Sequence, residues 1–119
     1  MRRVVIADDS IASLRQLEKI IAGSGEFEVV GTARNGLEAI RTYQAQHPDI
    51  LCMDLNMPEM DGISALRTLV ALDQQAKVVL VTSLGGVGDK FTEALKLGAK
   101  AIVAKPFQPE HLLRILREL

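Results

Sequence analysis

Residues 49–62 read DILCMDLNMPEMDG. The first part is a nearly continuous apolar run, which is typical of a strand covered on both faces in a parallel sheet. Asp54 follows this run directly, and a loop of turn-forming residues and acids leads to Asp61-Gly62, where a helical pattern begins. The stretch therefore predicts a buried strand, a loop and a helix, with an acid at the carboxyl end of the strand.

Other short runs rich in Val, Ile and Leu resemble the run at 49–53. They are VVIA (4–7), FEVVGTA (27–33), KVVLVT (77–82) and AKAIVA (99–104). The run at 27–33 alternates polar and apolar residues and predicts an edge strand, whereas the others are nearly continuous and predict strands covered on both faces.

The segments between these runs repeat apolar residues with the period of an α-helix. Helix ends carry recognisable signals: Ser10 is a predicted N-cap, Gly23 a stop, and Asn35 the start of the second helix. The last segment has the clearest period, with apolar residues at i, i+3, i+4 and i+7. These are Leu112, Ile115, Leu116 and Leu119.

Alternating strands and helices demand a parallel sheet with right-handed crossovers. Five units cannot close an eight-stranded barrel, so we expect an α/β fold with an open, doubly wound, five-stranded parallel sheet, (βα)5, in the order 2-1-3-4-5. One domain is expected to span residues 1–119. In such sheets ligands bind outside the carboxyl ends of the strands, beside the switch in strand order.

Composition excludes several classes of protein. The net charge of −1, with both signs interspersed, predicts neither direct nucleic-acid binding nor membrane binding by bulk electrostatics. The apolar runs are too short for a transmembrane helix. The lone Cys52 has no partner for an internal disulfide, which suits a reducing compartment. We therefore expect a cytoplasmic protein.

Ionisable and hydroxyl side chains gather at the predicted carboxyl edge. Each of these side chains has an ordinary explanation when taken alone; acids before helices, for example, usually serve as caps. Arg34-Asn35-Gly36, after the second run, indicates turn chemistry only. When they are considered together, the ordinary explanation is weaker, because carboxylates gathered at one edge repel one another and raise each other's pKa. The residues at this edge are Asp8-Asp9, Asp54, Thr82-Ser83 and Lys105-Pro106.

The charges at this edge predict a divalent cation. Asp8, Asp9 and Asp54 with Lys105 leave a net charge of −2, and an all-oxygen set of carboxylates suits Mg²⁺. A carboxylate beside Mg²⁺ can attack a phosphoryl group and form an acyl phosphate. Lys105 would offset charge on the phosphoryl oxygens, and Thr82 could donate a hydrogen bond to one of them.

Taken together, these motifs resemble the receiver domains of response regulators in two-component signalling, a CheY-like, flavodoxin-like family. The resemblance covers the whole chain, and QP at 108–109 is similar to single-domain chemotaxis regulators. The motifs, in order, are DD (8–9), D-x-x-M-P-x-M-D-G (54–62), T-S (82–83) and K-P-F (105–107).

The resemblance implies a role for each acid. Asp54 would be the phosphoacceptor and a metal ligand, and Asp9 a direct Mg²⁺ ligand. Asp8 would act through a water molecule, and the backbone carbonyl of Asn56 would complete the protein ligands.

It also implies a switch. Lys105 would pair with the phosphoryl group, with a cis bond to Pro106, and the Thr82 hydroxyl would move toward that group. Ile102 departs from the pattern, since receivers often carry Tyr or Phe three residues before the lysine. We therefore expect the conformational signal to depend more on the loop at 84–90 and the fourth helix.

The function implied is a phosphorylation-activated switch of a His-Asp phosphorelay, with chemotaxis as one setting. A histidine kinase would phosphorylate Asp54 with Mg²⁺, and an effector would bind the face of the fourth helix, fifth strand and fifth helix. The domain would catalyse only its own phosphorylation and dephosphorylation and would not be an enzyme for a separate substrate.

Three alternatives stay open. The first is a receiver domain cut from a larger regulator with a DNA-binding or enzymatic output domain. The second is a Mg²⁺-dependent aspartyl phosphatase, which commonly has a second acid where this chain has Asn56. The third is a flavin carrier, for which an aromatic content of 3% leaves little to stack on the ring.

Overall fold

The structure is a computed structural model. It describes residues 1–83 and 88–119. The first four residues of the predicted switch loop at 84–90 lie outside the described residues.

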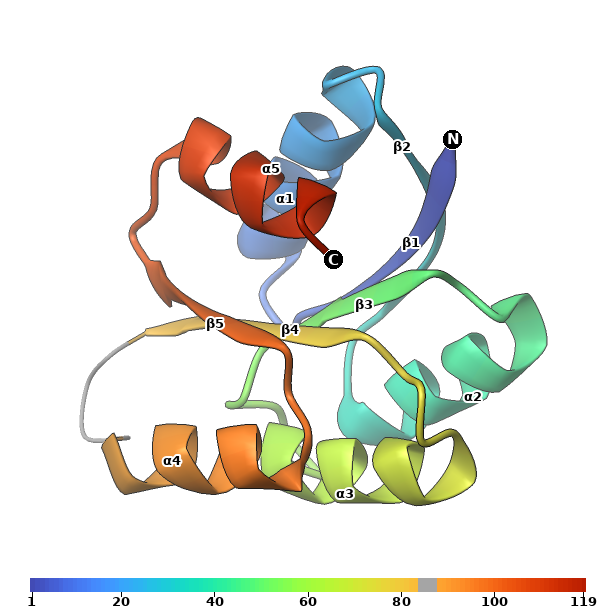
Figure 1. The fold of residues 1–119 in the computed structure, drawn as a ribbon, viewed down its shortest axis with the longest axis vertical. Helices are drawn as coiled ribbons and strands as arrows, with labels where there is room; N and C mark the ends of the chain where they lie inside the picture. Colours follow the sequence, from blue (N-terminus) through green and yellow to red (C-terminus); the bar gives the residue numbers. More distant parts are fainter. Residues whose placement is uncertain (84–87) are drawn as a thin grey trace.

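Strands and helices alternate along the chain, as the apolar patterns predict (Figure 1). The strands are β1 (Arg2–Ala7), β2 (Phe27–Ala33), β3 (Ile50–Met53), β4 (Val78–Ser83) and β5 (Ala101–Lys105). The helices are α1 (Ile11–Gly23), α2 (Gly36–Gln46), α3 (Gly62–Leu72), α4 (Gly88–Leu97) and α5 (Pro109–Arg117).

The strands form one parallel sheet in the order β2-β1-β3-β4-β5, so the predicted doubly wound order is confirmed. β2 lies at an edge, as its alternating pattern predicted. β5 lies at the other edge and is only partly buried, although its sequence is nearly continuous in apolar residues. An apolar run therefore did not distinguish this edge strand from a central one.

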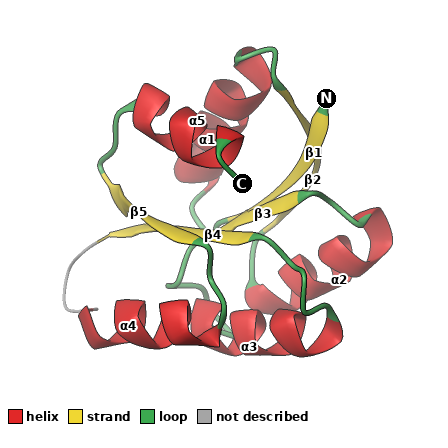
Figure 2. Cartoon of the chain, viewed as in Figure 1, coloured by secondary structure: helices red, strands yellow, loops and turns green. Residues whose placement is uncertain are grey.

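Helices cover both faces of the sheet. In Figures 1 and 2, α1 and α5 lie on one side and α2, α3 and α4 on the other. The two faces of β1 show why the run is continuous: Val5 and Ala7 pack in the core beneath α2, α3 and α4, whereas Val4 and Ile6 pack beneath α1 and α5. Removing such a side chain from water contributes roughly 1.5–3 kcal/mol, so both faces must be apolar.

Polar side chains cap three of the helices at the carboxyl edge of the sheet. Ser10, Asn35 and Asp61 each accept a hydrogen bond from a backbone N–H in the first turn of the helix that follows. The predicted start of α1 and of α2 is therefore confirmed. Within the described residues, no helix combines the length and apolar character that crossing a membrane requires.

Candidate functional site

The register of the sheet brings two acids side by side. Ala7 of β1 pairs with Met53 of β3, so the residues that follow them, Asp8 and Asp54, leave neighbouring strands at the same level. The Asp54 N–H donates to the Ala7 carbonyl at 3.0 Å, which extends the ladder to the acid itself. The strand ends thus determine the position of both carboxylates.

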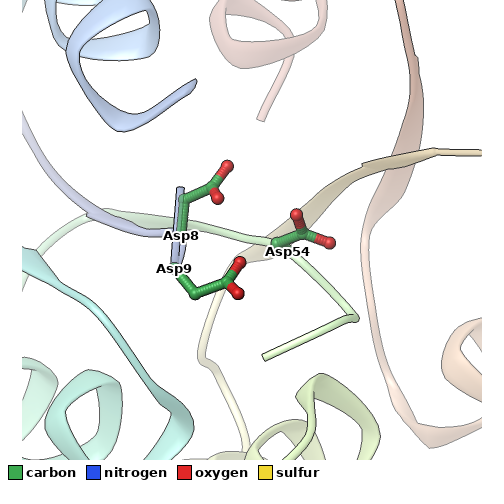
Figure 3. Close-up of side chains that lie close together, drawn as sticks. All are labelled: Asp8, Asp9 and Asp54. Atoms are coloured by element: carbon green, nitrogen blue, oxygen red, sulfur yellow. The ribbon is translucent and has the colours of Figure 1, made fainter. Parts of the chain in front are cut away.

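Asp8, Asp9 and Asp54 form a compact cluster of acids (Figure 3). One carboxylate oxygen from each lies within 4.8 Å of the others. Asp8 is 1% exposed and Asp54 is 9% exposed, whereas Asp9 is exposed. The donor set is hard and consists of oxygen atoms, so its chemistry fits Mg²⁺ rather than a softer metal.

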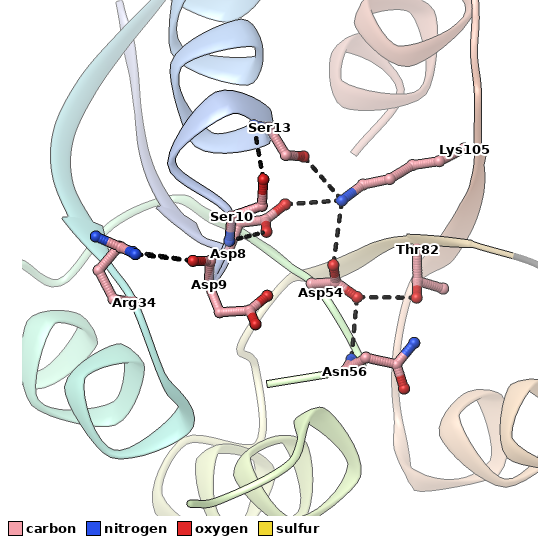
Figure 4. A network of polar contacts seen from close by, with 9 residues as sticks. All are labelled: Asp8, Asp9, Ser10, Ser13, Arg34, Asp54, Asn56, Thr82 and Lys105. Carbon is pink, nitrogen blue, oxygen red and sulfur yellow. Dashed lines mark hydrogen bonds and ion pairs between the residues drawn. The ribbon is translucent and has the colours of Figure 1, made fainter. Parts of the chain in front are cut away.

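Lys105, at the end of β5, reaches across to these acids (Figure 4). Its Nζ lies 2.7 Å from Asp8 Oδ2, 3.1 Å from Asp54 Oδ2 and 2.8 Å from Ser13 Oγ. An ammonium has three N–H donors, so these acceptors can occupy all of them. The peptide bond between Lys105 and Pro106 is cis.

The surroundings keep Lys105 charged. Burial alone would lower the pKa of its ammonium group, but hydrogen bonds and negative charges from Asp8 and Asp54 outweigh that effect and raise the pKa above its ordinary value. The cluster of acids therefore has a positive charge, that of Lys105, beside it throughout the neutral pH range.

The other oxygen of Asp54 has its own donors. Asp54 Oδ1 accepts from the Thr82 hydroxyl at 2.9 Å and from the Asn56 backbone N–H at 3.0 Å. Thr82 is fully buried, so its hydroxyl is held in place by the surrounding chain. With Lys105 on Oδ2, the carboxylate of Asp54 is oriented from both sides.

A cavity of about 600 Å³ opens beside these groups. Asp8, Asp54 and Lys105 line it, together with residues of the first turns of α1 and of the segment after β5. The Asp54 carboxylate at the edge of this cavity is therefore accessible to a small ligand.

Most of the predicted site residues come together. Asp8, Asp9, Asp54, Thr82 and Lys105 share one network of carboxylates and donors, and Asn56 contributes its backbone N–H. Ile102 lies apart from this network. It is half-buried opposite Leu80 of β4 and packs against the core beneath α2, α3 and α4.

The sequence did not single out two residues of the site. Ser13 accepts the Lys105 hydrogen bond, and Arg34, which was assigned to turn chemistry, donates to the Asp9 carbonyl through Nη2 at 2.8 Å. For Ser13 the available signal was a hydroxyl in the first helical turn after the acid pair. For Arg34 it was the strand order, which places the end of β2 beside the end of β1.

The model of the family described as "Response regulator receiver domain" matches residues 4–117. The chain belongs to this family. Among curated relatives, the receiver is similar to the chemotaxis protein CheY of Listeria monocytogenes (41% identity; 99% of this chain, 98% of the relative). It is also similar to CheY of Thermotoga maritima (39% identity; 99% and 97% covered).

Solved structures agree with this assignment. The receiver superposes on CheY in the CheX-CheY-BeF₃-Mg²⁺ complex of Borrelia burgdorferi with a TM-score of 0.92, at 32% identity, covering 98% of this chain and 87% of that chain. It is therefore a phosphorylation-activated response regulator of two-component signalling.

Proposed function

We propose that Asp54 is the phosphoacceptor of this receiver and that a histidine kinase supplies the phosphoryl group. The observation that carries the proposal is the orientation of the Asp54 carboxylate, which lies at the edge of the cavity between the Lys105 ammonium and the Thr82 hydroxyl. A nucleophile held in this way has already lost much of the freedom that would oppose reaction.

In the proposed reaction, a carboxylate oxygen of Asp54 forms a bond to phosphorus as the bond from phosphorus to the donor's imidazole nitrogen breaks. The imidazole leaves with the electron pair of that bond. Lys105 keeps its hydrogen bond to Asp8 and exchanges its bond to Asp54 for one to a phosphoryl oxygen. The Thr82 hydroxyl exchanges its hydrogen bond to Asp54 Oδ1 for one to another phosphoryl oxygen.

The proposal assigns Mg²⁺ to the three acids. When bound, the ion supplies positive charge against the phosphoryl oxygens. Asp9 is a proposed direct ligand, because its exposed carboxylate accepts no hydrogen bond from the described residues. Asp8 is proposed to act through water, as the family resemblance implies, and its oxygens accept from the Ser10 N–H and Lys105.

Asp54 and the carbonyl of Asn56 are the remaining proposed ligands. The hydrogen bond from the Asn56 N–H to Asp54 Oδ1 keeps this part of the loop close to the phosphoacceptor. The domain itself thus supplies the groups for its own phosphorylation and dephosphorylation, and no separate substrate is turned over.

The proposed output is a change in binding to an effector protein at the face of α4, β5 and α5. Thr82 on β4 and Lys105 on β5 link the phosphoryl site to the strands beside this face. Chemotaxis is the proposed setting, because the curated relatives named above are chemotaxis proteins. A cytoplasmic location is proposed as well, because phosphohistidine donors are made from ATP. An output domain in a longer regulator would leave this site chemistry unchanged.

Intact-protein mass spectrometry tests the assignment. The receiver is incubated with Mg²⁺ and acetyl phosphate, alongside Asp54→Asn and an Asp61→Asn control at the N-cap of α3. We expect a gain of one phosphoryl mass in the native protein and in Asp61→Asn, and no gain in Asp54→Asn. An undiminished gain in Asp54→Asn would falsify the proposal.

A further inference from the structure

We propose that Ser13 is a positioning residue, which holds the Lys105 ammonium so that one of its N–H groups points at the phosphoryl site. The inference rests on the proposed function, because it concerns the same transfer to Asp54. It adds a residue of α1 to those that determine the rate of phosphoryl transfer to Asp54.

A closed ring of hydrogen bonds contains Ser13 (Figure 4). The Ser10 N–H donates to Asp8 Oδ1 at 2.9 Å, and the Ser13 N–H donates to Ser10 Oγ at 3.3 Å. Lys105 Nζ then donates to Ser13 Oγ at 2.8 Å and to Asp8 Oδ2 at 2.7 Å. The backbone of the first turn of α1 therefore sets the position of the Ser13 side chain relative to Asp8.

Lys105 needs such a support. A lysine carries its charge on a flexible four-carbon stem with rotatable donors, so a single ion pair leaves its direction undetermined. The Lys105 side chain is 20% exposed and lines the cavity, so water competes for its N–H groups. With Asp8 and Ser13 as fixed acceptors, the remaining N–H points to Asp54 Oδ2 at 3.1 Å.

The hydroxyl is a suitable group for this task. Asp8, Asp9 and Asp54 already place like charges within 4.8 Å of one another, and a further carboxylate would add to their repulsion. Ser13 accepts a hydrogen bond without adding charge. On phosphorylation, Asp8 and Ser13 retain their bonds while the third N–H passes from Asp54 to a phosphoryl oxygen.

Loss of the hydroxyl should therefore slow transfer without weakening the metal site. In Ser13→Ala the freed N–H turns to water in the cavity, and the ammonium is less well directed in the transition state. We expect the rate constant for phosphorylation at saturating Mg²⁺ to fall by roughly 3–10-fold, which is less than the roughly 100-fold cost of removing a donor outright, because Lys105 keeps its bonds to Asp8 and Asp54. The Mg²⁺ affinity should stay within about 2-fold, because Ser13 is not among the carboxylates.

The experiment compares Ser13→Ala, Ser13→Thr, which retains the hydroxyl, and Gln16→Ala. Gln16 lines the same cavity from α1 but makes no side-chain hydrogen bond to a described residue, so it is a matched control. Each variant is measured for its phosphorylation rate with acetyl phosphate. The unphosphorylated proteins are measured by NMR for solvent exchange of the Lys105 ¹⁵Nζ ammonium protons.

We expect Ser13→Ala alone to slow phosphorylation and to speed ammonium exchange, with Ser13→Thr close to the native protein in both. Native-like rate and exchange in Ser13→Ala, or a Ser13→Thr that is as slow as Ser13→Ala, would overturn the inference. The exchange measurement needs no phosphorylation, so it decides the role of Ser13 even where Asp54→Asn has already disproved the proposed phosphoacceptor.

Discussion

Asp8 and Asp9 are neighbours in the chain, yet they have different surroundings. Asp8 is buried and both of its oxygens accept hydrogen bonds, from the Ser10 N–H and from Lys105. The Asp9 side chain is exposed, and Arg34 holds its backbone carbonyl instead. One acid is therefore committed to the lysine, whereas the other is available to a cation.

Replacing Asp9 should separate metal binding from folding. In the absence of Mg²⁺, Asp9→Asn should be at least as stable as the native protein, because the substitution relieves repulsion among the acids. Mg²⁺ at a hundred times its Kd should stabilise the native protein by about 2.7 kcal/mol. Asp9→Asn should lose most of this gain.

Urea unfolding in Mg²⁺ and in EDTA measures both effects. Glu118→Gln, an exposed acid at the end of α5, is the control and should retain the full gain. An equal Mg²⁺ gain in Asp9→Asn would show that Asp9 is not a ligand.

Lys105→Ala should destabilise the metal-free protein. Asp8 is 1% exposed and would lose its only cationic partner among the described residues. Breaking a buried pair costs about 3–5 kcal/mol, and we expect about 1–3 kcal/mol here because Lys105 is partly exposed. Mg²⁺ should restore part of this loss, while phosphorylation should no longer change effector binding. Chemical unfolding with and without Mg²⁺ checks the first part, and an unchanged metal-free stability contradicts it.

At the scale of the elements, the start of α3 lies against Asp54 and Leu55 through a close approach of backbones. A Cβ at Gly62 would lie 2.5 Å from Leu55 Cα and 2.6 Å from the Asp54 carbonyl oxygen. The Gly62 N–H donates to the Leu55 carbonyl at 2.8 Å. The start of α3 therefore fixes the backbone of Asp54, and only glycine at position 62 leaves room for this contact.

Gly62→Ala should move this backbone. The neighbours of the added methyl group are backbone atoms that cannot rotate away, so we expect a loss of about 1–3 kcal/mol in the free energy of unfolding. Phosphorylation of Asp54 should slow as well. Gly23→Ala, at the end of α1 with no atom near its added Cβ, should change stability by less than about 1 kcal/mol. Urea unfolding of both variants tests this, and equal losses would disprove the account.

Cys52 on the central strand β3 should make the free energy of unfolding depend on pH in the alkaline range. Burial raises the pKa of its thiol from 9.0 to about 12. The unfolded chain therefore releases this proton at lower pH than the folded chain, and stability is lost as pH rises between these two values.

Cys52→Ala removes this effect. Between pH 8 and pH 10 the free energy of unfolding of the native protein should fall by roughly 1.4 kcal/mol more than that of Cys52→Ala. The titration of Lys105, whose pKa is also raised, is common to both proteins and cancels in the comparison. Parallel pH profiles from urea unfolding would contradict the prediction.

At the scale of the whole molecule, the order of the strands connects the site to a distant surface. Thr82 pairs with Ala104, and Ile102 pairs with Leu80, so the same β4–β5 ladder links the hydrogen-bond partner of Asp54 to the residue that departs from the family pattern. Ile102 packs in the layer that contains Phe91 and Leu97 of α4. We therefore expect side-chain packing to transmit a shift of this ladder to α4.

An aromatic ring in place of Ile102 should change the coupling between the β4–β5 ladder and α4 more than it changes the phosphorylation rate. Because Ile102 lies outside the network around Asp54, Ile102→Tyr should keep the phosphorylation rate within about 2-fold. The larger tyrosine ring should alter how α4 and β5 respond to phosphorylation, and the affinity for the effector should change as a result.

Hydrogen exchange with and without beryllofluoride and Mg²⁺ measures this response. Ile115→Tyr, at a half-buried position in the opposite layer, is the control and should leave the response of α4 unchanged. A change in phosphorylation rate alone would show that Ile102 acts on the chemistry.

The sequence by itself determined the elements and their order in the sheet, because apolar period, caps and the alternation of strand with helix are local or nearly local properties. The helix starts at Ser10 and Asn35 and the edge position of β2 follow from such patterns. It also predicted which acids and which lysine meet, since parallel strands deliver their carboxyl ends to one edge.

Only the tertiary structure decided how these groups are held. Ser13 and Lys105 are 92 positions apart in the chain, yet their Oγ and Nζ atoms lie 2.8 Å apart. That distance depends on how α1 packs on the sheet and on which rotamers the packing allows, and no period in the sequence encodes either. The same holds for Arg34 on the Asp9 carbonyl. Strand order predicts which residues are neighbours, whereas packing determines which atoms bond.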